Sequence, residues 1–233
     1  MPPEIAQLIQ GVLIMALPAI FAITLHEAAH GFVANKLGDD TAMKAGRVTF
    51  NPIKHIDLFG TIIMPLLLFF ISRGQFLFGY AKPVPVRFDR LNHPRRDMVW
   101  VAAAGPATNI VLALVSALLL YSVPHVPVFF RVWLDGNLQY SIIFNVILAV
   151  FNMIPLPPLD GGRVAVGLLP DALAIPLAHT ERYGMLVLIV LLFLLPLLGD
   201  QIGMNLNIIS YVIQWPVEWL LDLISGITGI GIQ

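Results

Sequence analysis

The chain has 233 residues, of which 58% are hydrophobic and only 12% charged, and its mean hydropathy is +0.85. A typical soluble domain is about a quarter charged residues, so this composition indicates an integral membrane protein. The net charge of −1 offers no basic surface for nucleic acid. Cysteine is absent, which excludes disulfides and thiolate metal sites, so any metal must be bound by His, Asp or Glu.

Five stretches are long and apolar enough, or nearly so, to cross a bilayer, because a transmembrane helix needs about 20 mostly apolar residues. In chain order they are 8–35, 99–121, 139–159, 183–198 and 202–224. The first lacks a basic region before it, so we expect it to stay in the mature protein. A sixth run, 58–71, is short and contains Gly60 and Pro65, which is typical of a re-entrant segment.

The stretch MKAGRVTFNP, residues 43–52, has an Arg-Val-Thr-Phe centre that favours a short strand or hairpin at the membrane boundary. The predicted fold class is therefore an all-α polytopic membrane protein with five transmembrane helices, one re-entrant segment and a possible small β element.

Basic residues predict the topology, because Lys and Arg concentrate on the cytoplasmic side of membrane proteins. If 58–71 enters the bilayer and returns, the loops 36–57, 72–98 and 160–182 share one face. Of the 13 basic residues, Arg131 alone then lies on the other face. We therefore expect these loops to be cytoplasmic and the N-terminus to be outside.

The first apolar run contains HEAAH, residues 26–30. On a helix, His26 and His30 lie about 40° apart around the axis and about 6 Å apart along it, so they share a face. Two imidazoles at this spacing can bind one Zn²⁺, and Glu27 can act as general base toward a water on the metal. A packing pair of histidines with Glu27 as ion-pair partner is the alternative. It is disfavoured in a membrane helix, where ionisable groups are costly and mark functional sites.

A catalytic zinc needs a third protein ligand and one open position. Most of the 14 acidic residues lie in polar loops or near the chain ends; those that remain are Asp57, Asp160, Glu181, Glu218 and Asp222. Asp160 is favoured because it follows the run 139–159 within FNMIPLPPLDGGR, where prolines end the helix and two glycines allow a sharp turn. One crossing between the two motifs would bring both helix ends to the same face.

HEAAH on a membrane helix followed by NMIPLPPLDGG resembles the site-2 protease family of intramembrane zinc metalloproteases. GPATNIVLAL and FNPIKHIDLFG resemble its compact subgroup, which has no PDZ or CBS domain. The resemblance implies one zinc per chain bound by His26, His30 and Asp160, with Glu27 as catalytic base. It also implies that Asn152 steadies the substrate or the oxyanion; an interhelical packing bond is the alternative for this residue.

The expected function is hydrolysis of peptide bonds within or near transmembrane segments, as in regulated intramembrane proteolysis. We expect one membrane-embedded domain over 1–233, with a catalytic core over 8–170 and additional transmembrane helices over 183–224. The expected location is a prokaryotic cell membrane, multi-pass, with the active site toward the cytoplasm. The expected partners are the lipid bilayer and transmembrane protein or peptide substrates, without nucleic acid. A strand edge in 46–57 would bind extended substrate by β-augmentation.

Two other functions stay open at this point. A divalent-metal transporter or sensor could use the same His/His/Asp site. However, transporters usually show repeat symmetry, which this chain lacks, and a transporter would have little need of Glu27. A zinc peptidase of another family would use Glu181 or Glu218 as third ligand. Asn109 is interpreted as a packing residue among small neighbours. The remaining histidines are expected in solvated loops or at the surface: His55, His93, His125 and His179.

Overall fold

The computed structural model of the protein describes residues 3–64, 67 and 82–231. Across these residues the chain is helical and contains no strand. The α-helices are α1 (Pro3–Lys36), α2 (Thr41–Lys44), α4 (Pro94–Leu119), α5 (Val128–Asn152), α6 (Asp160–Leu168), α7 (Asp171–His179), α8 (Glu181–Ile189), α9 (Leu195–Ile202) and α10 (Ile208–Thr228). Short 3-10 or π-helical turns are η1 (Pro52–His55), η2 (Leu58–Ile63), η3 (Phe88–Arg90), η4 (Leu120–His125) and η5 (Val190–Leu194).

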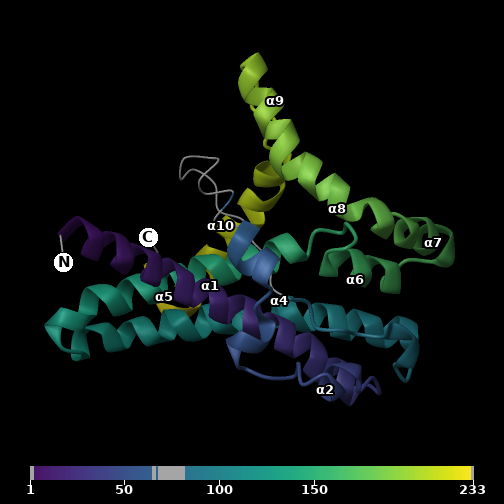
Figure 1. The fold of residues 1–233 in the computed structure, drawn as a ribbon, viewed down its shortest axis with the longest axis horizontal. Coiled ribbons are helices and arrows are strands. Elements are labelled where there is room, and N and C mark those ends of the chain that lie inside the picture. The colour runs from purple at the N-terminus through teal and green to yellow at the C-terminus, as the bar shows by residue number, and fades with distance from the viewer. Residues whose placement is uncertain (1–2, 65–66, 68–81, 232–233) are drawn as a thin grey trace.

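Three long helices, α1, α4 and α5, lie side by side and form the body of the molecule (Figure 1). Small residues allow α4 and α5 to approach closely, since Ala113 and Ala117 are fully buried against Ile142 and Val146. Helix α10 packs against both and adds Ile224 to this core. The continuous helix α8–η5–α9 instead rises away from the body (Figure 1). Only 11% of its most apolar stretch is buried, which suits a helix surrounded by lipid.

Four helical stretches are long and apolar enough to cross a membrane in the part of the chain that the structure covers: Ile14–Lys36, Pro94–His125, Val128–Asn152 and Glu181–Ile202. They correspond to the first four predicted crossings. The fifth, 202–224, overlaps α10, which begins at Ile208 and is not among them. The prediction of five crossings is therefore supported in its first four members only.

The predicted β element is wrong for the residues described. Residues 43–52 form the end of α2, bends and the start of η1 instead of a strand. The reason is local hydrogen bonding: the side chain of Asn51 accepts a hydrogen bond from the Ile53 amide, which starts the 3-10 turn, and the Asn51 amide donates to Thr49.

The predicted re-entrant run 58–71 lies partly outside the described residues; its first part is the π-helical turn η2. The side chain of Asp57 caps this turn by accepting a hydrogen bond from the Gly60 amide, at 2.7 Å. The Lys82 amide donates a hydrogen bond to the His55 carbonyl, at 2.9 Å. Residues 55 and 82 therefore lie together, which places both ends of the intervening chain on one side of the molecule.

The connection that carries Asp160 differs from its prediction. The helix expected over 139–159 is α5, which begins at Val128 and already ends at Asn152, so Asp160 is the first residue of α6 instead of the end of the preceding helix. Two glycines make the turn possible. A Cβ on Gly161 would lie 2.2 Å from the Met153 carbonyl oxygen, and one on Gly162 would lie 2.2 Å from the Pro157 nitrogen. Only hydrogen atoms fit at either position.

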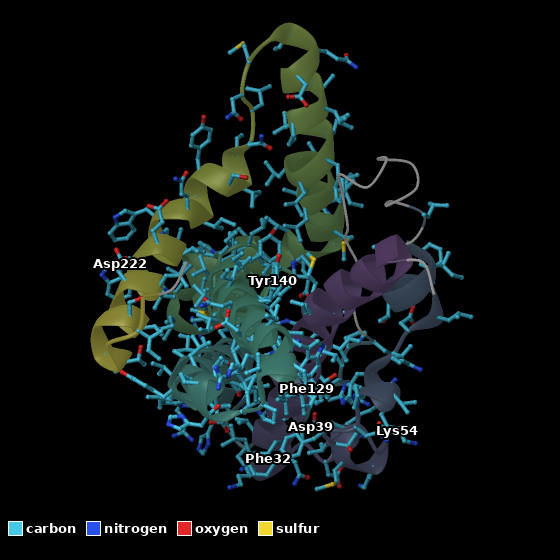
Figure 2. All side chains as sticks on the ribbon, turned by 90° about the vertical axis from the view of Figure 1, so that its left-hand side faces the viewer. Phe32, Asp39, Lys54, Phe129, Tyr140 and Asp222 are labelled. Atoms are coloured by element: carbon cyan, nitrogen blue, oxygen red, sulfur yellow. The ribbon has the colours of Figure 1, made fainter. Side chains whose placement is uncertain are left out.

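Asp39, which follows α1, holds two loop segments together. Its carboxylate accepts hydrogen bonds from the amide and hydroxyl of Thr41 and, at 2.6 Å, from the amide of Arg87. Asp39 is fully buried; it lies toward the same end of the view as Lys54 in Figure 2. Burial alone would raise the pKa of Asp39, but these hydrogen bonds stabilise the charged form and lower its pKa below the usual value.

We expect Asp39→Asn to reduce the free energy of unfolding by about 1–3 kcal/mol at pH 7, because an amide cannot accept all three hydrogen bonds. A depressed pKa stabilises the folded state above the unfolded-state value, near 4, and this stabilisation is lost as the pH falls through the folded-state pKa. The difference between the variant and the wild type should therefore shrink below about pH 4. Thermal unfolding in detergent from pH 7 to pH 3 measures both effects.

The matched control is Asp40→Asn, because the Asp40 side chain is 45% exposed and pairs with Lys44 on α2. A surface pair of this kind contributes about 0–1 kcal/mol. If Asp39→Asn and Asp40→Asn unfolded alike at every pH, the Asp39 hydrogen bonds would not stabilise this end of the molecule.

Candidate metal centre

Three possible metal ligands converge inside the bundle: His26 and His30 from α1, and Asp160 from the start of α6. The His26 Nε2 and His30 Nε2 atoms lie 3.1 Å apart, and Asp160 Oδ2 lies 3.1 Å from the first and 3.3 Å from the second. All three residues are at most 9% exposed. The structure thus brings together two residues of one motif and a residue about 130 positions later.

The hydrogen bonds behind the rings show which nitrogen carries the proton. His30 Nδ1 lies 2.7 Å from the Val101 carbonyl oxygen, which can only accept, so Nδ1 is protonated. His26 Nδ1 lies 2.6 Å from Asn109 Oδ1, an acceptor as well. In neutral imidazoles both Nε2 atoms therefore carry a lone pair and no hydrogen. With both rings neutral, the short contacts among the three ligand atoms therefore bring electron-pair donors together, with no hydrogen between them.

The orientation of the Asn109 amide is itself determined by its neighbours. Its Nδ2 group donates to the Ala22 carbonyl at 3.3 Å and to Asn145 Oδ1 at 2.8 Å, which leaves Oδ1 to face His26. The Asn145 amide is oriented in turn by donating to the Ser141 carbonyl at 2.8 Å. Two backbone carbonyls thus determine the tautomer of His26 through two buried amides.

This set of ligand atoms fits a zinc ion. Ligand atoms that share a tetrahedral zinc at 2.0–2.2 Å lie about 3.3–3.5 Å apart, close to the three distances observed. Asp160 Oδ2 is buried and has no hydrogen-bond partner among the residues described. Such an atom is costly in a low-dielectric interior unless a cation binds it. Each histidine also has the acceptor behind its ring that metal-bound histidines need.

Glu27 lies next to His26 on α1 and is partly exposed. Its Oε2 atom accepts a hydrogen bond from the Val84 amide, at 2.7 Å. Asn152, the other predicted catalytic residue, ends α5 and donates its side-chain amide to the Leu148 carbonyl of the same helix, at 3.0 Å. Within the described ranges, no hydrogen bond connects Asn152 to the three ligands.

Asn109 is the residue whose role the sequence interpretation missed. It contacts His26 directly, whereas we expected a packing residue. A signal was available, because Gly105 and Asn109 are four residues apart and so share one face of α4. That face lies against α1, with Asn109 fully buried.

The alternative ligands do not join the centre. Glu181 pairs with Arg163 at 3.3 Å, and Glu218 accepts a hydrogen bond from Gln214; both are exposed. The exposed histidines are His93, His125 and His179, as expected. His55 was expected in a solvated loop, and this is wrong: it is 2% exposed, and its Nε2 lies 3.1 Å from the Thr49 carbonyl because residues 46–56 fold back on themselves.

Comparisons with known proteins identify relatives of this chain. The model of peptidase family M50 matches residues 131–195. A Bacillus subtilis protein named "Putative zinc metalloprotease YwhC" is 40% identical over 188 residues, which cover 78% of this chain and 81% of that protein.

Two proteins named "Putative zinc metalloprotease Rip2" are each 29% identical to this chain. The match in Mycolicibacterium smegmatis covers 78% of this chain and 68% of that protein, and the match in Mycobacterium tuberculosis covers 94% and 76%. No solved structure matches the chain significantly. With an M50 match, a relative this similar over most of its length and a buried His/His/Asp centre, the chain belongs to peptidase family M50, the site-2 protease family, and is a zinc metalloprotease.

Proposed function

We propose that this protein hydrolyses peptide bonds within or near the transmembrane segments of membrane-protein substrates. The observation that carries this proposal is the position of the three ligand atoms. They are buried in a bundle whose long helices are apolar enough to span a membrane. His30 and His26 lie about 9 and 15 Å along α1 from Lys36, at 1.5 Å per residue, so the centre lies within the span and nearer its basic end.

His26, His30 and Asp160 would hold the zinc, and Glu27 would act as the general base. A zinc ion there would supply Lewis acidity, which polarises the scissile carbonyl and makes a water molecule more acidic. Glu27 would accept a proton from the attacking water and transfer it to the leaving amine. Asn152 remains a proposed partner of substrate or oxyanion. For this role its amide would have to exchange the Leu148 carbonyl for substrate.

The proposal also covers the side of the membrane on which the centre lies and the way in which substrate binds. The loops after Lys36, before Pro94 and after Asp160 carry most of the basic residues, which favours a cytoplasmic position for them and for the centre. The hydrogen bond between Lys82 and His55 supports a re-entrant path for the chain between them.

A substrate helix must unwind locally to expose its amides. Since residues 43–52 form no strand, β-augmentation along 46–57 finds no support here.

The space for the metal is created by a missing side chain on α4. A Cβ on Gly105 would lie 2.5 Å from His26 Cε1 and 2.6 Å from the Nε2 atoms of both His26 and His30. Gly105 itself is buried in the interior of a helix, where glycine is normally unfavourable. Its presence therefore follows from the room that the two imidazoles and their ligand require.

We expect Glu27→Gln to retain bound zinc and to lose cleavage by about 10²–10⁴-fold, the usual contribution of a general base. Asp160→Ala should lose much of its zinc, because one of three ligands is removed. Metal analysis of purified protein, together with cleavage of a panel of single-span membrane-protein substrates, measures both. Glu181→Gln, which alters an acid outside the centre, should retain zinc and activity. An active Glu27→Gln enzyme would contradict the proposed function.

Gly105→Ala should lower zinc binding and cleavage together, because the methyl group would occupy the space between the two rings. Alanine favours a helix over glycine by about 0.5–1 kcal/mol, so a loss of zinc could not be ascribed to a weaker helix. The matched control is Gly226→Ala on α10, where a Cβ meets nothing within 4 Å. Full zinc occupancy in Gly105→Ala would show that the ligand set lies elsewhere.

Asn109→Leu should weaken zinc affinity by about 10–100-fold, because His26 loses the acceptor that fixes its tautomer and ring orientation. Competition with a chelator of known affinity measures this without an activity assay. Asn137→Leu on α5 is the control, since the Asn137 amide donates only within its own helix, to the Trp133 carbonyl. Equal zinc affinities in the two variants would reduce Asn109 to a packing residue.

A further inference from the structure

The extended segment Lys82–Arg87, with sequence KPVPVR, crosses α1 on the side of Glu27. Within it, Val84 is 8% exposed, whereas Pro83 and Pro85 on either side are exposed. Proline has no backbone N–H, so Val84 carries the only backbone donor across residues 83–85. That single donor is used on the Glu27 carboxylate.

The position of Val84 is set by contacts on both sides of this hydrogen bond. Gly31, one helical turn after Glu27, leaves room for the Val84 side chain: a Cβ there would lie 2.9 Å from Val84 Cγ1. Upstream, the Lys82 amide donates to the His55 carbonyl at 2.9 Å, and downstream the Arg87 amide donates to Asp39 at 2.6 Å. The donor at Val84 therefore cannot move away without breaking other contacts.

The two prolines also reduce the conformational freedom of this segment. Each fixes its own φ near −65°, and Pro85 restricts Val84 to extended conformations because a residue before proline avoids the helical region. The free segment is therefore close to its bound conformation already. An amide held in this way orients a carboxylate at little cost in entropy.

We propose that Val84 is a positioning residue for the catalytic base, an inference that rests on the proposed function of Glu27. Its amide binds Oε2 at 2.7 Å, in the range of a charge-assisted hydrogen bond, and leaves Oε1 to accept the proton. A glutamate side chain has several rotatable bonds, so a fixed donor on one oxygen restricts where the other can lie. Small displacements of a catalytic group are costly: about 1 Å can reduce the rate by about 10²-fold.

The first test examines the hydrogen bond without any activity. Hydrogen exchange followed by mass spectrometry, on full-length zinc-loaded protein in detergent, reports on Val84 well, because its prolines contribute no exchanging amides. In Glu27→Ala the Val84 amide should exchange at least about 10-fold faster than in the wild type. The Arg87 amide, which is bound to Asp39, should be unchanged. Equal Val84 exchange in the two proteins would overturn the proposal.

The second test compares kinetics on whichever single-span substrate the wild type cleaves. Val84→Pro removes the donor while retaining an extended backbone, and it should lower kcat by about 10–100-fold with KM within about twofold and zinc content unchanged. Val84→Ala retains the N–H and should lose less of kcat than Val84→Pro. Replacing the Val84 amide by an ester removes the N–H without changing the side chain, and it should lower kcat by the same factor as Val84→Pro. This variant keeps the test decisive if Val84→Pro folds poorly.

Several outcomes would overturn the inference. An unchanged kcat in the ester variant would mean that the hydrogen bond does not position Glu27 for the reaction. An increased kcat would instead identify the contact as inhibitory. An equal loss in Val84→Ala would assign the effect to side-chain packing. If the wild type cleaves no substrate, the proposed function fails, while the exchange experiment still decides whether Val84 binds Glu27.

Discussion

Two imidazole nitrogens and a carboxylate oxygen face one another inside a membrane bundle, and when both imidazoles are neutral all three atoms are electron-pair donors. Their mutual repulsion is poorly screened, because the surroundings are apolar and water is largely excluded. Acceptors behind the rings, Val101 for His30 and Asn109 for His26, hold the lone pairs in this arrangement. A bound cation converts the repulsion into attraction. Folding of the bundle and binding of the metal are therefore coupled in free energy.

Much of this centre could be predicted from residue spacing and helix direction. The i, i+4 spacing of His26 and His30 needs only a regular helix, which local hydrogen bonds determine. Asp160 could be found by elimination, because few acids in this chain lie next to an apolar run. The prediction placed Asp160 at the end of its helix, whereas it begins the next one, after a loop that folds back on Gly161 and Gly162. The loop displaces the residue along the chain but keeps it at the same end of α5.

Features that depend on tertiary partners could not be predicted in this way. The centre of residues 43–52 has strand-forming residues, but no strand among the described residues satisfies its backbone. Side-chain hydrogen bonds of Thr49 and Asn51 determine its conformation instead. The link from Asn109 to His26 joins residues 83 positions apart, and the link from Val84 to Glu27 joins residues 57 apart. Neither separation leaves a periodic signal in the sequence. Burial of His55 likewise depends on how the chain folds back around it.

The hydrogen bond between the Lys82 amide and the His55 carbonyl has a consequence for how relatives of this protein can diverge. It holds residues 55 and 82 next to each other, so the two points at which the intervening chain leaves and rejoins the rest of the structure are fixed. The entropic cost of connecting two fixed ends rises slowly with length, by about 0.6 kcal/mol for each doubling. A change in the length of the intervening chain therefore need not alter the spacing of Glu27, His26 and Val84. One backbone hydrogen bond thus separates the length of a connection from the geometry that the chemistry requires.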